Sequence, residues 1–195
     1  MQRYLSCKKK GSKMDKRYSS IRDNKERGSV GDFLKSNIDS DSKLSIVSAY
    51  FTIYAYYNLK DKLDNIEELR FLFGEPTFIQ SIDSYNQNYK VFKIENDELT
   101  IPFETRLKQK LISKKCSEWI KTKVHIKSMI KPDFLHGKMY HIQQKNKMLK
   151  AIFGSSNFTA RGLGFGNSPN IELNLEVTDD RDRKDLLGWF NEIWD

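Results

Sequence analysis

The stretch that decides the fold is His136-Gly137-Lys138-Met139-Tyr140, which is followed later in the chain by Gly154-Ser155-Ser156-Asn157. Residues 134–142 and 148–153 are rich in β-forming side chains, and the polar run 143–147 between them predicts a hairpin turn. A glycine then ends the second strand. The sequence therefore predicts two antiparallel strands with a tight turn directly after them.

Side chains alternate between the two faces of a strand, which decides what this hairpin presents. His136, Lys138 and Tyr140 are expected on one face, and Met139 and His141 on the other. The imidazole and the ammonium would lie about 7 Å apart along the strand. The Ser155 hydroxyl and the Asn157 carboxamide follow Gly154. Together with His136 and Lys138 they give one nucleophile, one cation and two hydrogen-bonding groups, a set that suits binding and attack of a phosphate.

The pattern His136-x-Lys138 followed by Gly154-Ser155-x-Asn157 resembles the HxK…GSxN signature of the phospholipase D superfamily, which includes metal-independent nucleases. Residues 154–163, 170–174 and 189–194 are similar to the phospholipase-D-like domain at the front of bacterial Swi/Snf-type (DEAD/DEAH) helicases. Related single-motif domains serve as restriction endonucleases. The resemblance covers roughly residues 29–195, with its core at 135–174. One position departs from the pattern, because Gln143 stands where the family often has Asp.

The resemblance implies an α/β fold with a mixed, largely parallel β-sheet sandwiched by helices. It implies that His136 attacks phosphorus and forms a phosphohistidine, while Lys138 neutralises the phosphate oxygens. Ser155 and Asn157 would hydrogen-bond the same oxygens. In the family, a glutamate on the strand after GSxN reaches the catalytic histidine, and Glu172 is the matching position.

The number of histidines bears on the assembly. A second imidazole must protonate the leaving oxygen and later activate water. The chain has three histidines and one HxK motif. His125 lies in a hydrophobic alternation and His141 faces away from Lys138, so both are interpreted as packed or surface imidazoles. We therefore expect a homodimer in which two copies of His136 share one site. No cofactor is expected, and no metal, because no HExxH, carboxylate cluster or Cys/His set is present.

Composition limits the class of protein. The length of 195 residues suits one domain, which we place at residues 29–195. No apolar run is long enough to cross a membrane, and the basic N-terminus lacks the apolar segment of a signal peptide. Cys7 and Cys116 lack metal-ligand spacing, so we expect reduced thiols in a cytoplasmic protein.

The positive charge is concentrated in two segments of the chain. Residues 1–28 hold ten Lys or Arg and three acids, and we interpret them as a disordered basic arm; Met14 is an alternative start. Residues 105–150 hold thirteen Lys or Arg and two acids. A basic segment beside the motif strand favours a polyanionic substrate, and DNA rather than lipid. For any single lysine, the alternative is that it lies on a solvated helix face. The last helix has no stop signal, which suggests continuation into a helicase or ATPase segment.

The remaining elements are predicted from periodicity and capping signals. Strands at 43–51 and 69–73 flank a helix from Thr52 to about Asp64, and this βαβ unit implies a parallel pair. Further expected elements are helices at 31–38, at 103–121 and from Thr178 onward, and strands at 91–94, 124–127 and 170–177. In the last strand Glu172, Asn174 and Glu176 share one face, which is either functional or simply solvated.

Three functions compete at this point. The first is a metal-independent phosphodiesterase acting on DNA within a helicase, restriction or defence system. The second is a catalytically silent module that grips phosphate and targets a helicase to DNA. The third is a lipid phospholipase or phosphatidyl transferase, which activity on vesicles would reveal.

Overall fold

The computed structural model describes residues 19–74, 103–129 and 135–195. Within them lie four helices: α1 (Val30–Asn37), α2 (Ile53–Leu63), α4 (Phe103–Lys123) and α5 (Asp180–Trp194). The strands of the described chain are β1 (Ile21–Arg22), β2 (Lys43–Ser48), β3 (Glu68–Phe73), β4 (Val124–Ser128), β5 (Lys138–Gln143), β6 (Leu149–Gly154) and β7 (Asn174–Val177). The strand expected at 91–94 lies outside the described residues.

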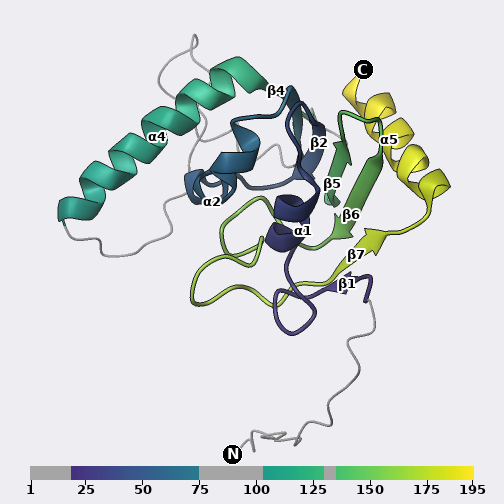
Figure 1. Ribbon diagram of the computed structural model, residues 1–195, viewed down its shortest axis with the longest axis horizontal. Helices are drawn as coiled ribbons and strands as arrows, with labels where there is room; N and C mark the ends of the chain where they lie inside the picture. Colours follow the sequence, from purple (N-terminus) through teal and green to yellow (C-terminus); the bar gives the residue numbers. More distant parts are fainter. Residues whose placement is uncertain (1–18, 75–102, 130–134) are drawn as a thin grey trace, which may run out of the picture.

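The strands form one sheet in the order β1-β7-β6-β5-β2-β3-β4. Helices α1, α2 and α4 lie on one side of it and α5 on the other (Figure 1). The predicted α/β fold with a mixed sheet between helices is confirmed. The βαβ unit is also confirmed, since β2 pairs with β3 in parallel and β3 with β4. The parallel part is smaller than expected, because the four other pairings, around the β5–β6 hairpin, are antiparallel.

Local capping explains where three helices begin. Ser29 caps α1 and forms a capping box with Asp32, whose side chain accepts from the Ser29 backbone. Thr52 caps α2 by accepting from Ala55 N, as the sequence predicts. Asp179 caps α5. These side chains satisfy backbone N–H groups that have no partner inside the helix.

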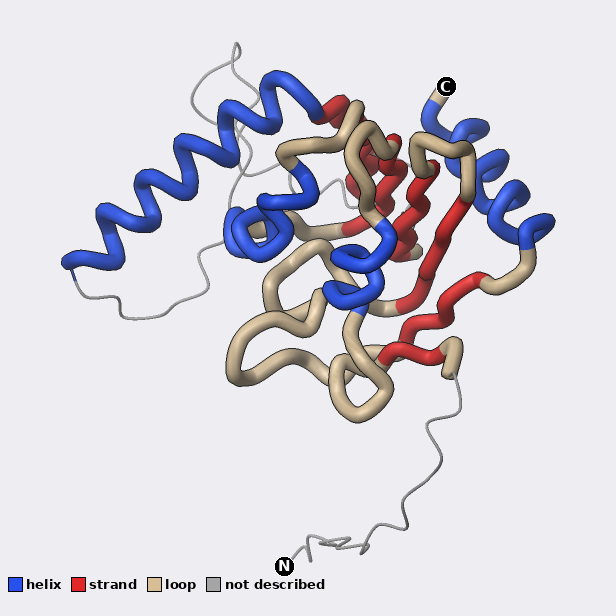
Figure 2. The backbone as a smooth tube through the Cα atoms, viewed as in Figure 1, coloured by secondary structure: helices blue, strands red, loops and turns tan. Residues whose placement is uncertain are grey.

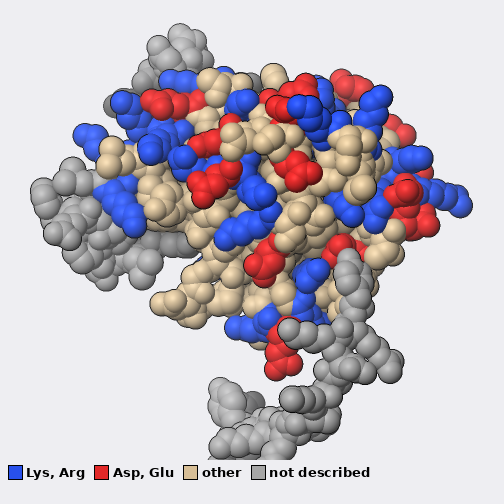
Figure 3. Space-filling view, in the orientation of Figure 1, with Lys and Arg blue, Asp and Glu red and all other residues tan. Residues whose placement is uncertain are grey.

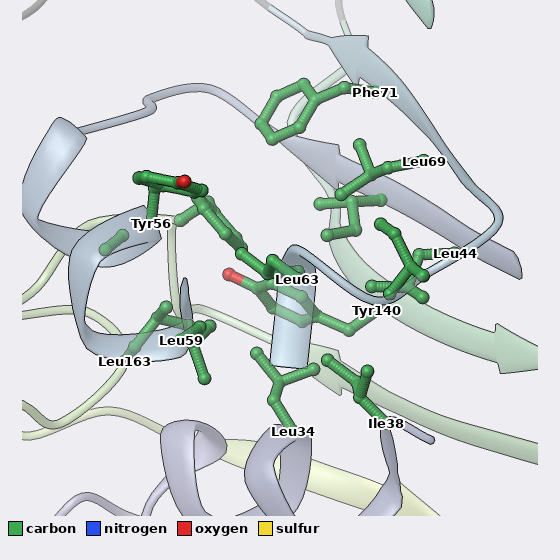
Figure 4. Close-up of a cluster of buried hydrophobic side chains, with 14 of the residues drawn as sticks. Leu34, Ile38, Leu44, Tyr56, Leu59, Leu63, Leu69, Phe71, Tyr140 and Leu163 are labelled. Atoms are coloured by element: carbon green, nitrogen blue, oxygen red, sulfur yellow. The ribbon is translucent and has the colours of Figure 1, made fainter. Parts of the chain in front are cut away.

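The main core lies between the sheet and the three helices on its first side. Figure 4 shows Leu34 from α1 and Ile38 directly after it, Leu59 and Leu63 from α2, and Tyr140 from β5 meeting there. A smaller cluster on the other side packs Val47, Leu72 and Met139 against Phe190 of α5. Both sides of the central strands are therefore buried, which holds the motif strand β5 rigidly.

The N-terminal segment differs from the prediction. Residues 1–18 lie outside the described part, but residues 19–28 are part of the fold and not of a disordered arm. Ile21 pairs with Leu175, and the Arg22 side chain bonds Glu176 at 3.0 Å. Asn24 is buried and bonds Gly162 O at 2.8 Å. These partners are about 140–150 residues distant in sequence, so local composition gave no sign of them.

The orientation of β7 rules out one of the two interpretations of its polar face, namely that this face is simply solvated. The strand is shorter than expected and begins at Asn174. Asn174 is buried, and Glu176 forms a salt bridge with Arg22. The apolar residues at 171, 173 and 175 point outward instead. A merely solvated polar face is therefore wrong for Asn174 and Glu176, because both side chains have partners inside the fold.

Candidate active site

The candidate site lies at one end of the sheet, where β5 begins, β6 ends and β7 begins. In the register, Lys138 lies opposite Gly154, and Gly154 lies opposite Asn174. The end of β2 reaches the same place through Ser48. The loop that follows β6 runs past α1 before the chain returns to β7 (Figure 2), and its Leu163 carbonyl accepts from Gly31 N of α1 at 2.8 Å. Antiparallel pairing thus brings together two motifs that are separated in the sequence.

His136 and Lys138 are in direct contact. His136 lies just before β5 and is exposed, whereas Lys138 is largely buried. The Lys138 Nζ donates to the His136 carbonyl at 2.9 Å and lies 3.4 Å from its Nε2. An ammonium only donates, so this contact is compatible with Nε2 as the unprotonated, nucleophilic nitrogen. The spacing is shorter than the expected 7 Å, since the Lys138 side chain folds back toward the ring.

The Gly154-Ser155-Ser156-Asn157 segment is anchored by its central residue. Ser156 is fully buried, and its backbone N donates to Asn174 Oδ1 at 3.2 Å. Its carbonyl accepts from Tyr140 Oη at 2.8 Å. Burial, with the Glu172 carboxylate as a second cause, raises the pKa of Tyr140 well above its usual value, so the phenol stays a donor.

Glycine is required at the start of this segment. A Cβ on Gly154 would lie 2.2 Å from Leu173 O and 2.6 Å from Asn174 Cα. Both are backbone atoms, which a side-chain rotation cannot remove. Gly154 therefore allows β6 and the chain before β7 to approach closely enough for the loop to be held by Asn174.

The orientation of the Asn157 amide is fixed from β2. Asn157 Oδ1 accepts from Ala49 N at 3.1 Å and lies 3.2 Å from Ser48 Oγ, whose one hydrogen also has the Tyr50 carbonyl as an acceptor at 2.8 Å. The same Ser48 hydroxyl accepts from Phe158 N at 2.9 Å. Because the carbonyl oxygen of the amide is used by these donors, its NH2 group is the part left to donate.

Ser155 and Glu172 form a second contact of the site. The Ser155 hydroxyl donates to Glu172 Oε2 and accepts from Leu173 N at 3.0 Å. The other carboxylate oxygen accepts from Asn170 Nδ2 at 3.2 Å. A hydroxyl has one hydrogen, so in this arrangement Ser155 directs it to Glu172 and not to a phosphate. The expected hydrogen bond from Ser155 to a phosphate stays a prediction.

The other two histidines lie elsewhere. His125 is exposed on β4, 3.9 Å from Glu68 Oε2. His141 is buried on the α5 side of the sheet, with Nε2 3.1 Å from Arg183 O. Within the described ranges, no group of three or more His, Cys, Asp or Glu is arranged to hold a metal ion.

Comparison with known proteins identifies the family. The family model described as "Cardiolipin synthase, PLD-like domain" matches residues 34–194. The chain belongs to this phospholipase-D-like family. A structure of a mutant yeast tyrosyl-DNA phosphodiesterase is similar at a TM-score of 0.42 and 14% identity, over 73% of this chain and 26% of that one. No curated protein matches the chain.

The candidate site thus contains two contacting pairs, His136 with Lys138 and Ser155 with Glu172, joined through the sheet register. Sequence reasoning missed Ser48 and the anchoring role of Asn174. Ser48 lies near the end of the strand predicted at 43–51, shortly before the Thr52 helix cap, which is a position where site residues are common in α/β sheets. Its place in the strand was the one feature of the sequence that could have indicated Ser48. That place does not show which loop the Ser48 hydroxyl contacts.

Three further findings describe the rest of the molecule. No helix in the described part of the chain is both long and apolar enough to cross a membrane. Basic and acidic side chains are interspersed over the face shown in Figure 3, where α4 carries many of the lysines. Cys116 is buried and free, and burial raises the pKa of its thiol to about 12.

Proposed function

We propose that this chain is a metal-independent phosphodiesterase that hydrolyses nucleic-acid backbones, DNA above all, through a phosphohistidine intermediate. The observation that carries the proposal is the 3.4 Å contact between Lys138 Nζ and His136 Nε2. It places a fixed cation next to the lone pair of an exposed imidazole. A phosphate oxygen bound by the ammonium would hold phosphorus within reach of that nitrogen.

The proposed first step is attack of His136 Nε2 on phosphorus. A P–N bond forms, and the bond from phosphorus to the leaving oxygen breaks. Lys138 neutralises charge on the non-bridging oxygens, and the Asn157 NH2 group donates to them. Well-placed donors of this kind are worth about 3–4 kcal/mol each. Ser48 and Ala49 hold Asn157 so that this group needs no reorientation during the reaction.

A second imidazole is needed to complete the reaction. It gives its proton to the leaving oxygen, and it later removes a proton from the water that breaks the P–N bond. His125 and His141 do not serve, because one lies on β4 and the other on the opposite side of the sheet. We propose that His136 of a second copy supplies it in a homodimer.

We propose that Glu172 orients the His136 ring through its Nδ1–H, as the third group of a triad does. The structure supports a fixed carboxylate at this end of the sheet, held by Ser155 and Asn170. Ser155 then acts through Glu172. The sequence resemblance supports a further proposal, that the domain works with a helicase or ATPase segment in a restriction or defence system.

The test is cleavage of plasmid DNA by the purified chain in EDTA. We expect cleavage by the wild type, and at least a thousandfold loss in His136→Ala and Lys138→Ala. His125→Ala, which removes an exposed imidazole remote from the site, is the matched control and should cleave normally. A single-turnover reaction with labelled substrate, quenched in alkali, should trap label on the wild type and not on His136→Ala.

Three outcomes would count against the proposal. DNA binding without cleavage of any substrate would indicate a silent phosphate-gripping module. Cleavage that EDTA abolishes would indicate metal chemistry. Release of headgroups from phospholipid vesicles, with DNA left intact, would indicate a lipid enzyme.

A further inference from the structure

The excess positive charge of the described chain lies on helix α4 and the strand that follows it. Residues 103–129 hold eight Lys or Arg and two acids. Residues 19–74 hold eight and nine, and residues 135–195 hold eight of each. The other two described segments are therefore close to neutral. A helix with this concentration of cations attracts a polyanion.

Among its described side chains, α4 packs against the protein through one face. Ile112, Cys116 and Trp119 are buried, at the three- and four-residue spacing of a helical face. Trp119 Nε1 donates to Leu63 O at 2.9 Å, and its ring centroid lies 4.8 Å from that of Tyr56. These contacts join α4 to α2, which lies beside it in Figure 1. Exposed lysines lie around the rest of the helix, at positions 108, 110, 114, 115 and 121.

An exposed aromatic ring lies beside two of these lysines. Tyr57 on α2 is 42% exposed, and Lys108 Nζ lies 5.7 Å from the centroid of its ring. Lys115 lines a hollow of about 330 Å³ between α2 and α4. It lies seven residues after Lys108, which is about 10 Å along the helix axis. We call Tyr57, Lys108 and Lys115 the α2–α4 surface.

The carboxylates near this surface are paired or outnumbered. Asp64, which lines the hollow, is bonded by Lys60. Asp61 on α2 lies between two lysines in the chain. Residues 108–123 hold six lysines and one acid, Glu118. The α2–α4 surface therefore stays positive, and its lysines remain available to an anionic partner.

An exposed ring among cations fits single-stranded nucleic acid. Lysines follow the phosphates of a strand, and a base without a pairing partner stacks on an aromatic face. In a duplex the bases are stacked on one another, so Tyr57 would have no base to contact. A helix that lies on a lipid surface needs a free apolar face. The described apolar face of α4 is instead buried in the main core.

Helix α2 connects this surface to the candidate active site. The backbone N of its cap residue Thr52 donates to Phe158 O at 3.1 Å, and the Thr52 hydroxyl accepts from Ala160 N at 3.3 Å. Both partners belong to the loop that follows β6. Tyr57 lies five residues after the cap, about 7–8 Å along the helix axis. A strand that leaves the site along α2 therefore meets Tyr57 and then the α4 lysines.

We propose that the α2–α4 surface binds an unpaired strand of the substrate beside the bond that is cleaved. Lys108 and Lys115 contact its phosphates, and Tyr57 stacks on one of its bases. This proposal rests on the proposed function for the identity of the substrate as nucleic acid. It adds where the strand lies on the protein, and that the strand is single at this place.

The test of the lysines is binding of a fluorescein-labelled oligothymidine, measured by fluorescence anisotropy on the His136→Ala protein. Adding Lys108→Gln and Lys115→Gln together should weaken binding at least tenfold. The slope of log affinity against log salt concentration should fall by about 1.4, since each phosphate contact on a single strand contributes about 0.7. Glutamine forms helices about as well as lysine, so α4 should persist, which circular dichroism checks.

The matched control removes two other lysines. Lys147 and Lys184 are exposed and line a hollow formed by the β5–β6 hairpin and α5. The double variant Lys147→Gln/Lys184→Gln loses the same net charge, and it should keep its affinity within twofold. Equal weakening in both double variants would overturn the proposal, because it would show attraction by net charge alone. Unchanged affinity in Lys108→Gln/Lys115→Gln would also overturn it.

The test of the ring uses two variants of Tyr57. Tyr57→Ala should weaken binding of oligothymidine about tenfold and leave the salt slope unchanged, because stacking releases no counterions. Tyr57→Phe keeps the ring and should bind as Tyr57 does. Equal affinity for oligothymidine and for duplex DNA, with no effect of Tyr57→Ala, would overturn the assignment of a single strand. Lysine-dependent binding to anionic phospholipid vesicles, without binding of oligothymidine, would assign the surface to lipid instead.

Cleavage by proteins that retain His136 separates this proposal from the proposed function. Lysine-dependent binding of oligothymidine, with no cleavage of any nucleic acid, would leave the α2–α4 surface standing and remove the phosphodiesterase. Cleavage of single-stranded DNA that is equally efficient, in kcat/KM, with and without Lys108→Gln/Lys115→Gln would overturn the surface and leave the phosphodiesterase standing. A raised KM with little change in kcat in this variant supports both.

Discussion

Ser48 is a buried hydroxyl at the end of β2 that serves two neighbours in the site loop. It contacts Asn157 Oδ1 at 3.2 Å and accepts from Phe158 N at 2.9 Å. One residue of a parallel βαβ unit therefore fixes both the loop and the amide that would touch phosphate. Such positioning matters because a donor that must reorient during the reaction stabilises the transition state less.

Ser48→Ala should lower the rate of DNA cleavage about tenfold to a hundredfold, chiefly through kcat, because Asn157 loses one of its two orienting contacts. Unfolding should become easier by about 1–3 kcal/mol, since Phe158 N is left without its partner. Steady-state kinetics and denaturant unfolding measure the two effects. Ser45→Ala is the control: Ser45 is buried on the same strand but accepts from Arg70, away from the site. Equal loss of activity in both variants would show that Ser48 acts only through stability.

Among the elements, the junction of β6 with β7 is where an added side chain is least tolerated. Gly154→Ala should cost about 1–3 kcal/mol of unfolding free energy and most of the cleavage activity, because the new Cβ meets the Leu173 carbonyl at 2.2 Å. Thermal unfolding and plasmid cleavage measure this. Gly137→Ala is the matched control, since a Cβ there meets no atom within 4 Å. Unchanged stability and cleavage in Gly154→Ala would mean that the end of β6 and the chain before β7 can move apart without cost.

At the scale of the whole molecule, His141 links stability to pH. Burial is the largest cause that lowers the pKa of His141, to about 4 from 6.5. As the pH falls, His141 is therefore protonated in the unfolded chain before it is protonated in the folded one. Its contribution to the free energy of unfolding is complete above pH 6.5 and is lost as pH falls toward 4. Between pH 7.5 and pH 5 this group alone should remove about 2 kcal/mol of unfolding free energy.

The measurement is urea unfolding of the wild type and His141→Gln between pH 7.5 and 5. The variant should show a flatter dependence on pH over this range. His125→Gln, which removes an exposed imidazole, should keep the wild-type slope. Parallel curves for the wild type and His141→Gln would show that the buried ring takes up its proton as easily in the folded state.

The proposed shared site makes a further prediction about whole dimers. When a fixed amount of wild type exchanges subunits with a tenfold excess of His136→Ala, nearly every wild-type chain is paired with a variant. Cleavage should fall roughly tenfold, because such dimers hold one imidazole instead of two. The same excess of His125→Ala, which keeps its own His136, should not lower cleavage. Equal activity with and without the His136→Ala excess would mean that each subunit works alone.

The sequence by itself determined the elements and the motif pair. Strands and helices with clear periodicity, the Thr52 cap and the shared strand of His136 and Lys138 depend on residues close together in the chain, so local patterns carry them. The opposite faces of Lys138 and His141 follow from the twofold period of a strand.

Only the tertiary structure decided how distant segments complete the site. Residues 19–28 join the sheet because Arg22 and Asn24 find partners near the other end of the chain. The polar face of β7 turns inward because Asn174 bonds Ser156, and Ser48 reaches Asn157 across 109 positions of sequence. Alternation shows which residues share a face, but it does not show which face is buried. That choice is made by the hydrogen-bond partners that the rest of the fold supplies.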